Sequence, residues 1–335
     1  MTLRNAREMD YPFEQSISSM MTFCDEVCVL DSSDKQDGTW EKLTELQTRY
    51  PGVLKIHHEN INWSAPNHGI FDGQTKQLAR EMCRGQYLWQ CDSDEIVHED
   101  HAPLIRPLIE QIGAQFQKVP VLALPVVEYW GGTGKVRIDV NPWKWRVTLN
   151  IKDIVHGIPS ELRWNDPLSG LDYARPGTDT CDYISRATGE RYPCIFFIPP
   201  EVDKARVNAI RSNPASEENL KGFEVWFNST LQQLPGVFHY SWFSIERKIL
   251  QYQMFWTGFW KAMYNENRDE RQNPFFPGLL WSEVTDEMIK EKALILEANT
   301  GGHIFHTPWD GSKTNSIRVF KNHPAVMDEW INSHK

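Results

Sequence analysis

The sequence predicts an α/β fold, in which helices cover both faces of a mostly parallel sheet. Strand-like and helix-like segments alternate over the first hundred residues, which is the pattern of parallel strands joined by helices. Two of the strand-like segments run directly into acidic residues, at Asp31 and at 92–95. The length of 335 residues is enough for about two domains.

The first elements have clear local signals. A short apolar run ends at Asp31 and predicts a strand over 25–31. Apolar residues at helical spacing then predict a helix over 40–50, which a Pro-Gly pair ends. A second strand is expected at 53–56.

The next helix and strand lead to the second acidic cluster. A helix is expected over 75–84, closed by Gly85, and a strand over 86–91 runs straight into the acidic segment 92–95. In parallel α/β sheets, ligands bind beyond the carboxyl ends of the strands. Both acidic clusters are therefore expected at one binding edge.

The second half of the chain has weaker signals. An apolar run at 119–127 contains two prolines, so we expect an edge strand or a bulged strand. The segment 165–200 is rich in Gly, Pro, Asp and Thr and predicts an inserted loop. Helices are expected at 217–234 and 244–265. The second has many aromatic but few basic residues, which favours a buried core helix over one resting on a membrane surface.

Composition excludes several classes of protein. Hydrophobic residues make up 40% of the chain and charged residues 24%, as in a globular protein. The net charge of −10 argues against a general nucleic-acid binder. The six cysteines lack C-x-x-C spacing, and no apolar segment follows a basic start. We therefore expect reduced thiols and a cytoplasmic protein.

The acidic segment 92–95 is the most informative chemical feature. Carboxylate oxygens suit Mg²⁺ or Mn²⁺, and Asp92 and Asp94 at a strand end can hold a divalent ion from one side. Such an ion can neutralise a departing nucleoside diphosphate. The alternative is an acidic turn or the N-cap of a helix.

Five short motifs follow one another in the first hundred residues: Arg4-Asn5, Asp31-Ser32, Asp37-Gly38-Thr39, Gly73 with Lys76-Gln77, and Asp92-Ser93-Asp94-Glu95. Their order resembles the nucleotide-binding half of the inverting family 2 glycosyltransferases, which have a GT-A fold. The resemblance implies a nucleotide-sugar-binding half over 1–125 and an acceptor-binding half over 126–335. The chain departs from the family pattern in the short segment before Arg4, and in Lys76-Gln77, where Arg-Asn is usual.

The resemblance also implies roles for single residues. Asp31 is expected to bond the base of the donor, and Lys76 to face its diphosphate or ribose. His239 stands in the position of a late histidine that completes the metal site, and a core histidine is its alternative. The implied donor-binding residues are Arg4, Asn5, Asp31, Lys76, Asp92 and Ser93. The implied ligands of Mn²⁺ or Mg²⁺ are Asp92, Asp94 and His239.

An inverting transfer also needs a carboxylate that accepts the proton of the acceptor hydroxyl. Glu128, at the end of an apolar run beside aromatic residues, is favoured over Asp153, and Asp139 is a weaker third candidate. An exposed acid at a strand end is the alternative for Glu128. Trp130 and His156 are expected in the acceptor site, since tryptophan faces stack on sugars.

These expectations lead to three functional hypotheses. The first is a metal-dependent, inverting glycosyltransferase that moves a sugar from a nucleoside diphosphate, with UDP favoured, to a saccharide acceptor in surface-glycan synthesis. Its place would be the cytoplasm, and contact with the inner face of the membrane stays open. The second is a glycoside hydrolase, which needs two carboxylates and no nucleotide. The third is a GT-A-like binding protein without turnover. Nucleotide binding separates the first from the second.

Overall fold

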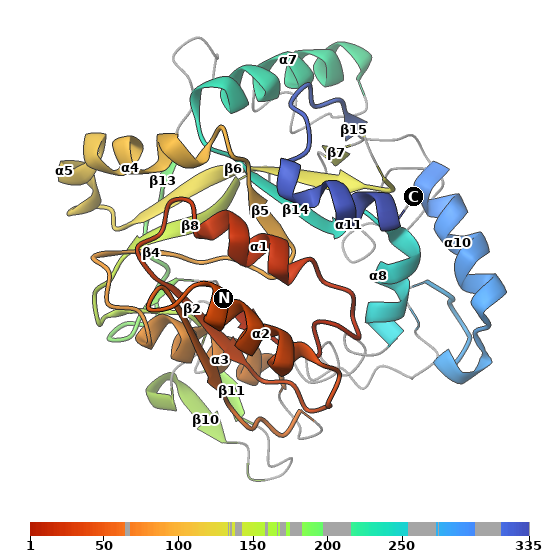
Figure 1. Cartoon of the computed structure of the whole chain (residues 1–335), viewed down its shortest axis with the longest axis horizontal. Helices are drawn as coiled ribbons and strands as arrows, with labels where there is room; N and C mark the ends of the chain where they lie inside the picture. Colours follow the sequence, from red (N-terminus) through yellow and green to blue (C-terminus); the bar gives the residue numbers. More distant parts are fainter. Residues whose placement is uncertain are drawn as a thin grey trace.

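Figure 1 shows the computed structural model of the chain, in which a parallel sheet near the N-terminus lies beside a larger mixed sheet. Asp139, Cys181, residues 254–265 and about half of the expected loop at 165–200 fall outside the part that the structure describes. The described residues are 1–63, 68–132, 134, 136–137, 143–157, 160–165, 167, 172–174, 183–196, 216–253, 273, 275–298 and 316–334.

The N-terminal sheet is parallel, with the strand order β1-β2-β3. Its register sets Leu3, Asp31 and His58 level with one another at the carboxyl edge. Leu43 and Leu46 are fully buried in its core, which explains the helical spacing of the apolar residues. The predicted strands and helices of this part are confirmed, as β2 (Val27–Asp31), α2 (Thr39–Arg49), β3 (Leu54–His58) and α3 (His68–Glu81), although α3 begins and ends earlier than expected. The strand β1 (Thr2–Leu3) precedes them, and the helix α1 (Phe13–Met20) was not expected.

The second sheet has eight strands in both orientations. Here the expectation of one mostly parallel sheet is corrected, because β4 pairs antiparallel with β8 and not with the N-terminal strands. An apolar run of three or four residues predicts a strand but carries no signal for its partner. The strands are β4 (Tyr87–Trp89), β5 (Glu95–Val97), β6 (Val121–Trp130), β7 (Val136–Arg137), β8 (Trp143–Leu149), β13 (Ile195–Phe196), β14 (Val237–Trp242) and β15 (Ser316–Ile317).

Strand β6 is central in this sheet, so the expectation of an edge strand at 119–127 is wrong. All ten of its residues are buried, and it pairs with β14 on one side and β8 on the other. The expected bulge is present, as a register shift between Leu122 and Ala123. Pro125 is accommodated opposite Trp143 of β8. The domain boundary suggested at residue 125 falls within this continuous strand.

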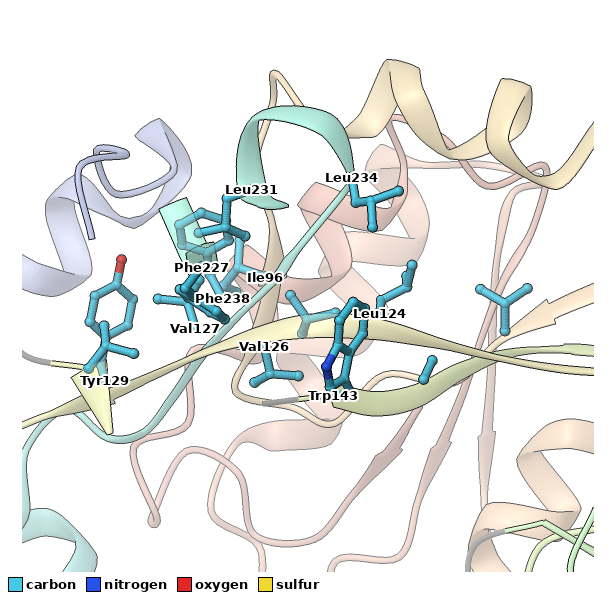
Figure 2. Close-up of a cluster of buried hydrophobic side chains, with 14 of the residues drawn as sticks. Ile96, Leu124, Val126, Val127, Tyr129, Trp143, Phe227, Leu231, Leu234 and Phe238 are labelled. Atoms are coloured by element: carbon cyan, nitrogen blue, oxygen red, sulfur yellow. The ribbon is translucent and has the colours of Figure 1, made fainter. Parts of the chain in front are cut away.

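The main hydrophobic core lies between this sheet and the helix α7 (Glu217–Gln233). Figure 2 shows Phe227 and Leu231 of α7 against Val127 of β6 and Phe238 of β14. The predicted helix at 217–234 is confirmed. It begins at Ser216, whose hydroxyl accepts a hydrogen bond from the backbone N–H of Asn219.

A third cluster packs Trp130 with the helices α8 (Ile245–Gln251) and α10 (Asp286–Ala298). Ile245 and Ile249 of α8 are buried in it, so the described start of the helix expected at 244–265 is a core helix. The remaining helices are α4 (Ala102–Gln111), α5 (Gly113–Phe116) and α11 (Asp328–Ser333), and the short strands are β9 (Ile154–Val155), β10 (Arg163–Asn165), β11 (Asp172–Ala174) and β12 (Ile184–Ser185).

The α/β class is therefore confirmed, in a GT-A-like layout in which the acidic segment 92–95 lies between a parallel sheet and a mixed sheet. Within the described ranges, no helix combines the length and the hydropathy of a membrane span. The cysteines Cys24, Cys28, Cys83, Cys91 and Cys194 are free thiols.

Candidate functional site

A pocket of about 280 Å³ lies where the carboxyl ends of β1 and β2 meet α3, β14 and α8. It brings together segments that are more than 200 residues apart in the sequence. Six of the predicted donor or metal residues line it: Arg4, Lys76, Asp92, Ser93, Asp94 and His239. Its other lining residues are Thr2, Leu3, Met9, Tyr11, Ser32, Trp63, Thr75, Ser241 and Lys248.

One wall of the pocket is formed by Arg4 and Trp63. The Arg4 guanidinium lies 4.4 Å from the centre of the Trp63 ring and pairs with Asp34 at 2.9 Å. The Trp63 indole donates to the carbonyl of Ser32 at 2.8 Å. Asn5 has a φ of 44° and donates to Asp34 at 2.7 Å, so it shapes the turn that presents Arg4. The sequence gives no signal that marks Trp63, because only the tertiary fold brings it to Arg4.

Asp31 does not line the pocket, although it ends β2 as expected. Its side chain is fully buried. One carboxylate oxygen accepts hydrogen bonds from the backbone N–H and the hydroxyl of Ser33, and the other lies 3.1 Å from Nδ1 of His58. The structure therefore places Asp31 as a support of the loop after β2, and its role at the base stays a prediction.

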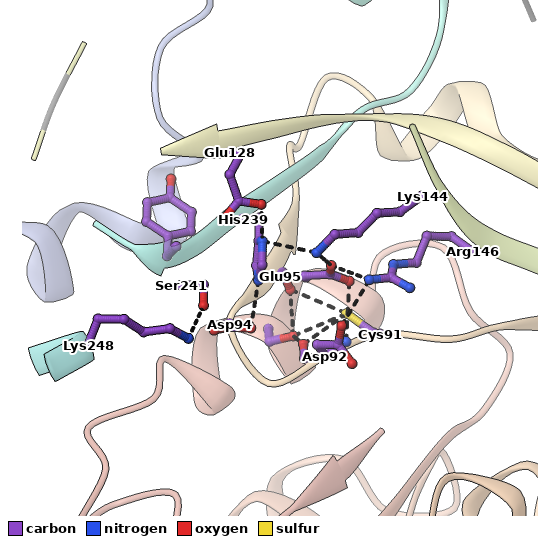
Figure 3. Close-up of polar contacts among 12 residues, drawn as sticks. Cys91, Asp92, Asp94, Glu95, Glu128, Lys144, Arg146, His239, Ser241 and Lys248 are labelled. Carbon is purple, nitrogen blue, oxygen red and sulfur yellow. Dashed lines mark hydrogen bonds and ion pairs between the residues drawn. The ribbon is translucent and has the colours of Figure 1, made fainter. Parts of the chain in front are cut away.

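Strand register gathers the charged groups behind the pocket. Glu95 of β5 pairs with His239 of β14, and His239 pairs with Glu128 of β6. These side chains consequently lie side by side, as Figure 3 shows. Next to them, β8 contributes Lys144 and Arg146, which the sequence does not single out.

The acidic segment 92–95 is held by these basic residues. Arg146 donates to Asp92 at 2.9 Å and also pairs with Glu95. Lys144 lies 3.0 Å from Glu95, which is fully buried. Burial alone would raise the pKa of Asp92, but Arg146, Lys76 and Lys144 together hold it well below the usual range. Asp92 is thus an anion at every physiological pH.

His239 bridges two carboxylates. Its Nδ1 lies 2.5 Å from Glu128, and its Nε2 lies 3.2 Å from Asp94 (Figure 3). Burial alone would lower the pKa of His239, but Glu128 and Asp94 outweigh it and raise that pKa to about 9. The Lys144 ammonium, 3.0 Å from Nδ1, opposes this rise. Burial opposes ionisation of Asp94 as well, but His239 keeps the pKa of Asp94 low.

The expected divalent ion fits these side chains poorly. Among the described residues, no three His, Cys, Asp or Glu side chains come together as a metal-binding group. Both nitrogens of His239 already have polar partners, since Nε2 lies 3.2 Å from Asp94 and Nδ1 lies 2.5 Å from Glu128 and 3.0 Å from Lys144. Asp92 is already paired with Arg146. The dependence on Mn²⁺ or Mg²⁺ stays a prediction, with which this arrangement disagrees.

Lys248 is a further cation at the pocket that the sequence does not single out. It belongs to α8, whose N-cap Ser244 accepts from the backbone N–H of Arg247 at 3.3 Å. The Lys248 ammonium donates to the Ser241 hydroxyl at 2.5 Å and lies 5.5 Å from the centre of the Trp242 ring. Burial lowers the pKa of Lys248 to about 8, against the opposing effect of Asp94.

The candidates for catalysis and acceptor binding lie outside the pocket lining. Glu128 is buried, and its carboxylate lies 2.5 Å from His239, which lines the pocket. Asp153 accepts from the hydroxyl of Tyr192 and from the backbone N–H of Ala187, so it supports the corner near β9 and β12.

Trp130 and His156 also lie elsewhere. The Trp130 ring is buried, stacks on Trp242 at 4.9 Å and donates to the carbonyl of Leu296, which corrects its expected place in an acceptor groove. Ten buried residues in β6 extend the core to this tryptophan. His156 is buried against Tyr183 and lines a separate cavity of about 380 Å³, beside Gln77.

Comparisons with known proteins give no family. No protein-family model matches the chain, and no curated protein matches it. The solved structure of S. aureus TarS is similar over 88% of this chain and 52% of its own, at 14% identity and a TM-score of 0.32. This chain thus spans about half the length of that one. The structure of S. aureus TarS 1-349 in complex with UDP-GlcNAc is similar over 88% of this chain and 86% of its own, at 12% identity and a TM-score of 0.31. At these values the likeness adds nothing to the topology described above.

Proposed function

We propose that this protein binds a nucleoside-diphosphate sugar in the pocket and transfers the sugar to a saccharide acceptor. One observation carries the proposal: the pocket at the carboxyl ends of the parallel strands joins Arg4 and Trp63 with Lys76 and the segment 92–95. An aromatic ring and a guanidinium can stack on and bond a nucleoside, and an ammonium can pair with a diphosphate. Ligands of α/β sheets bind at this edge.

The charge states favour transfer over hydrolysis of a glycosidic bond. A glycoside hydrolase needs one carboxyl group with a raised pKa, which stays protonated and acts as the acid. At the pocket, the pKa values of both Asp92 and Asp94 are lowered by neighbouring cations. Neither can donate a proton at neutral pH, whereas departure of a diphosphate needs no such acid if cations stabilise it.

Finer parts of the proposal follow the family resemblance. They are an inverting displacement, membership of family 2, a UDP-linked donor, and a role in surface-glycan synthesis in the cytoplasm. Glu128 remains the favoured base. Its carboxylate is buried, and the contact with His239 fixes its position, as the function of a general base requires. The free thiols of the described cysteines agree with a reducing compartment.

Calorimetric titration with UDP tests donor binding, and UDP-GlcNAc serves as a second probe. We expect UDP to bind more tightly than uridine, and Lys76→Ala to weaken UDP binding about tenfold, as for the loss of a charged hydrogen bond. Lys42→Ala is the matched control. It removes a lysine from the neighbouring helix α2, where Lys42 pairs with Glu14 and Glu45 outside the pocket. Absence of binding by UDP, GDP, CDP and ADP overturns the proposal.

Transfer itself is tested separately from binding. Glu128→Gln keeps the shape of the side chain and removes its negative charge. We expect the variant to bind UDP like the wild type while release of UDP from UDP-sugars in the presence of saccharide acceptors is lost. If this variant still transfers the sugar, another residue must be the base.

A further inference from the structure

We propose that basic side chains, with Lys248 foremost, hold the diphosphate of the donor in this pocket, and that binding requires no divalent cation. The inference rests on the proposed function for the presence of a nucleoside diphosphate. It departs from the metal dependence that the sequence predicts. The observations that carry it are the partners of each carboxylate, the balance of charge, and the way in which Lys248 is held.

Each carboxylate at the pocket already has a cationic partner. Asp92 pairs with Arg146 at 2.9 Å and lies 3.9 Å from Lys76. Asp94 lies 3.2 Å from Nε2 of His239. A divalent ion at these oxygens would displace these charge-assisted contacts and take one anionic partner each from Arg146 and His239, which are both buried.

The charges around the pocket cancel without a metal. Four carboxylates face four lysine or arginine side chains, and His239 lies among them with both nitrogens on carboxylates. A dication would add positive charge to a set that is already neutral or positive, whereas a diphosphate would add negative charge beside its basic side chains. The carboxylates are Asp92, Asp94, Glu95 and Glu128, and the basic residues are Lys76, Lys144, Arg146 and Lys248.

Lys248 and Lys76 are the members of this set placed to meet a ligand, because both line the pocket while Lys144 and Arg146 do not. Lys248 is 5% exposed, and its ammonium is fixed on the Ser241 hydroxyl at 2.5 Å. The rings of Trp242 and Tyr252 lie 5.5 and 5.7 Å from the same nitrogen. An ammonium held in this way stabilises a developing negative charge without reorganisation.

The chemical step balances with these groups alone. The acceptor oxygen forms a bond to the anomeric carbon while the bond from that carbon to the phosphate oxygen breaks. The electron pair of the broken bond stays on the nucleoside diphosphate, next to Lys248 and Lys76. The proton of the acceptor hydroxyl passes to the carboxylate base. In other enzymes, a metal ion supplies the positive charge that stabilises the departing oxygen.

Calorimetric titration of UDP in EDTA and in Mn²⁺ tests the inference on the wild type, Lys248→Gln and Lys42→Gln. We expect the Kd of the wild type to agree within about twofold between EDTA and Mn²⁺. Lys248→Gln should weaken UDP binding about tenfold or more, while uridine binding is unchanged, because the lost group meets the diphosphate. Lys42→Gln should behave like the wild type.

The opposite results are distinct. Binding of UDP that appears only with Mn²⁺ overturns the inference while leaving the proposed function intact. Equal UDP affinity of Lys248→Gln and the wild type removes the role of Lys248. No binding of UDP, GDP, CDP or ADP under either condition overturns the proposed function together with this inference. If Lys248→Gln does not fold, as judged by circular dichroism, Lys76→Gln on the partly exposed face of α3 carries the same test.

Discussion

His239 shows how two strands fix the charge of one side chain. Its register partners place Glu128 on one nitrogen, and the segment 92–95 places Asp94 on the other. His239 lies between two buried carboxylates, so its loss removes a polar partner from each of them. The residue is thus part of the stability of the site as well as of its electrostatics.

We expect His239→Gln to lower the free energy of unfolding by about 3 kcal/mol, the typical cost of breaking a buried ion pair. Urea unfolding followed by circular dichroism measures this loss. In the double variant with Glu128→Gln, part of it should be recovered because one unpaired anion is gone. A loss below about 1 kcal/mol in the single variant would show that Glu128 and Asp94 find other partners.

His101 makes a second prediction at this scale. Its Nδ1 accepts from the backbone N–H of Gly236 at 3.0 Å, and its Nε2 lies 2.9 Å from the carbonyl of Leu231, to which the neutral ring donates. Protonation would break the first of these bonds. Burial and the charge of Lys321 lower the pKa of His101 to about 4.

Because the unfolded chain binds a proton at His101 near pH 6.5 and the folded chain only near pH 4, stability is full above pH 6.5. It is lost as the pH falls from 6.5 to 4, by about 3 kcal/mol in total. Urea midpoints at pH 7, 5.5 and 4.5 measure the loss. In His101→Asn, the free energy of unfolding should change less with pH. If it changes as much as in the wild type, other groups cause the dependence on pH, and the neighbouring His98 is the first candidate.

At the scale of elements, α3 is packed backbone to backbone against the turn after β9. A Cβ atom at Gly73 would lie 2.7 Å from the Cα of Gly157, which itself has a φ of 77°. The Gln77 side chain accepts from the backbone N–H of His156 at 2.9 Å. This close approach sets the position of the whole helix, and with it the position of Lys76.

We therefore expect Gly73→Ala to lower the free energy of unfolding by about 1–3 kcal/mol and to weaken UDP binding, since α3 must shift outward. Gly113→Ala in α5 is the matched control, because nothing lies within 4 Å of the added methyl group, and it should change neither quantity. Thermal unfolding and calorimetry measure both effects. Unchanged UDP affinity in Gly73→Ala would show that the position of α3 does not limit binding.

At the scale of the whole molecule, the pocket joins the N-terminal segment to β14 and α8, which lie more than 200 residues later in the sequence. Arg247 donates to the carbonyl of Asp10 at 2.9 Å, and Gln251 donates to the carbonyl of Met9 at 2.8 Å. The helix that carries Lys248 is thereby tied to the loop that follows Arg4. A ligand in the pocket contacts both segments and should stabilise them together.

Hydrogen exchange with and without UDP tests this coupling. We expect slower exchange over both 1–11 and 239–251 when UDP is bound, and no change in α10, none of whose residues lines the pocket. Protection of only one of the two segments would contradict a binding site that both segments share.

The sequence by itself determined the order of strands and helices in the first hundred residues and the acidic ends of two strands. Local spacing is enough for this, as Leu43 and Leu46 show, because one helix face must be buried whatever it packs against. It also marked six residues of the pocket, through the motifs that carry the family resemblance.

The tertiary structure alone decided which strands are neighbours and which charges meet. The apolar run at 119–127 shows that β6 is buried but not that β14 and β8 lie beside it, so the sequence could not bring His239 to Glu128 or Arg146 to Asp92. Lys144, Arg146 and Lys248 resemble ordinary surface residues in the sequence, and Trp130 resembles a sugar-stacking one. Their roles depend on contacts between distant segments, and local residue patterns contain no information about such contacts.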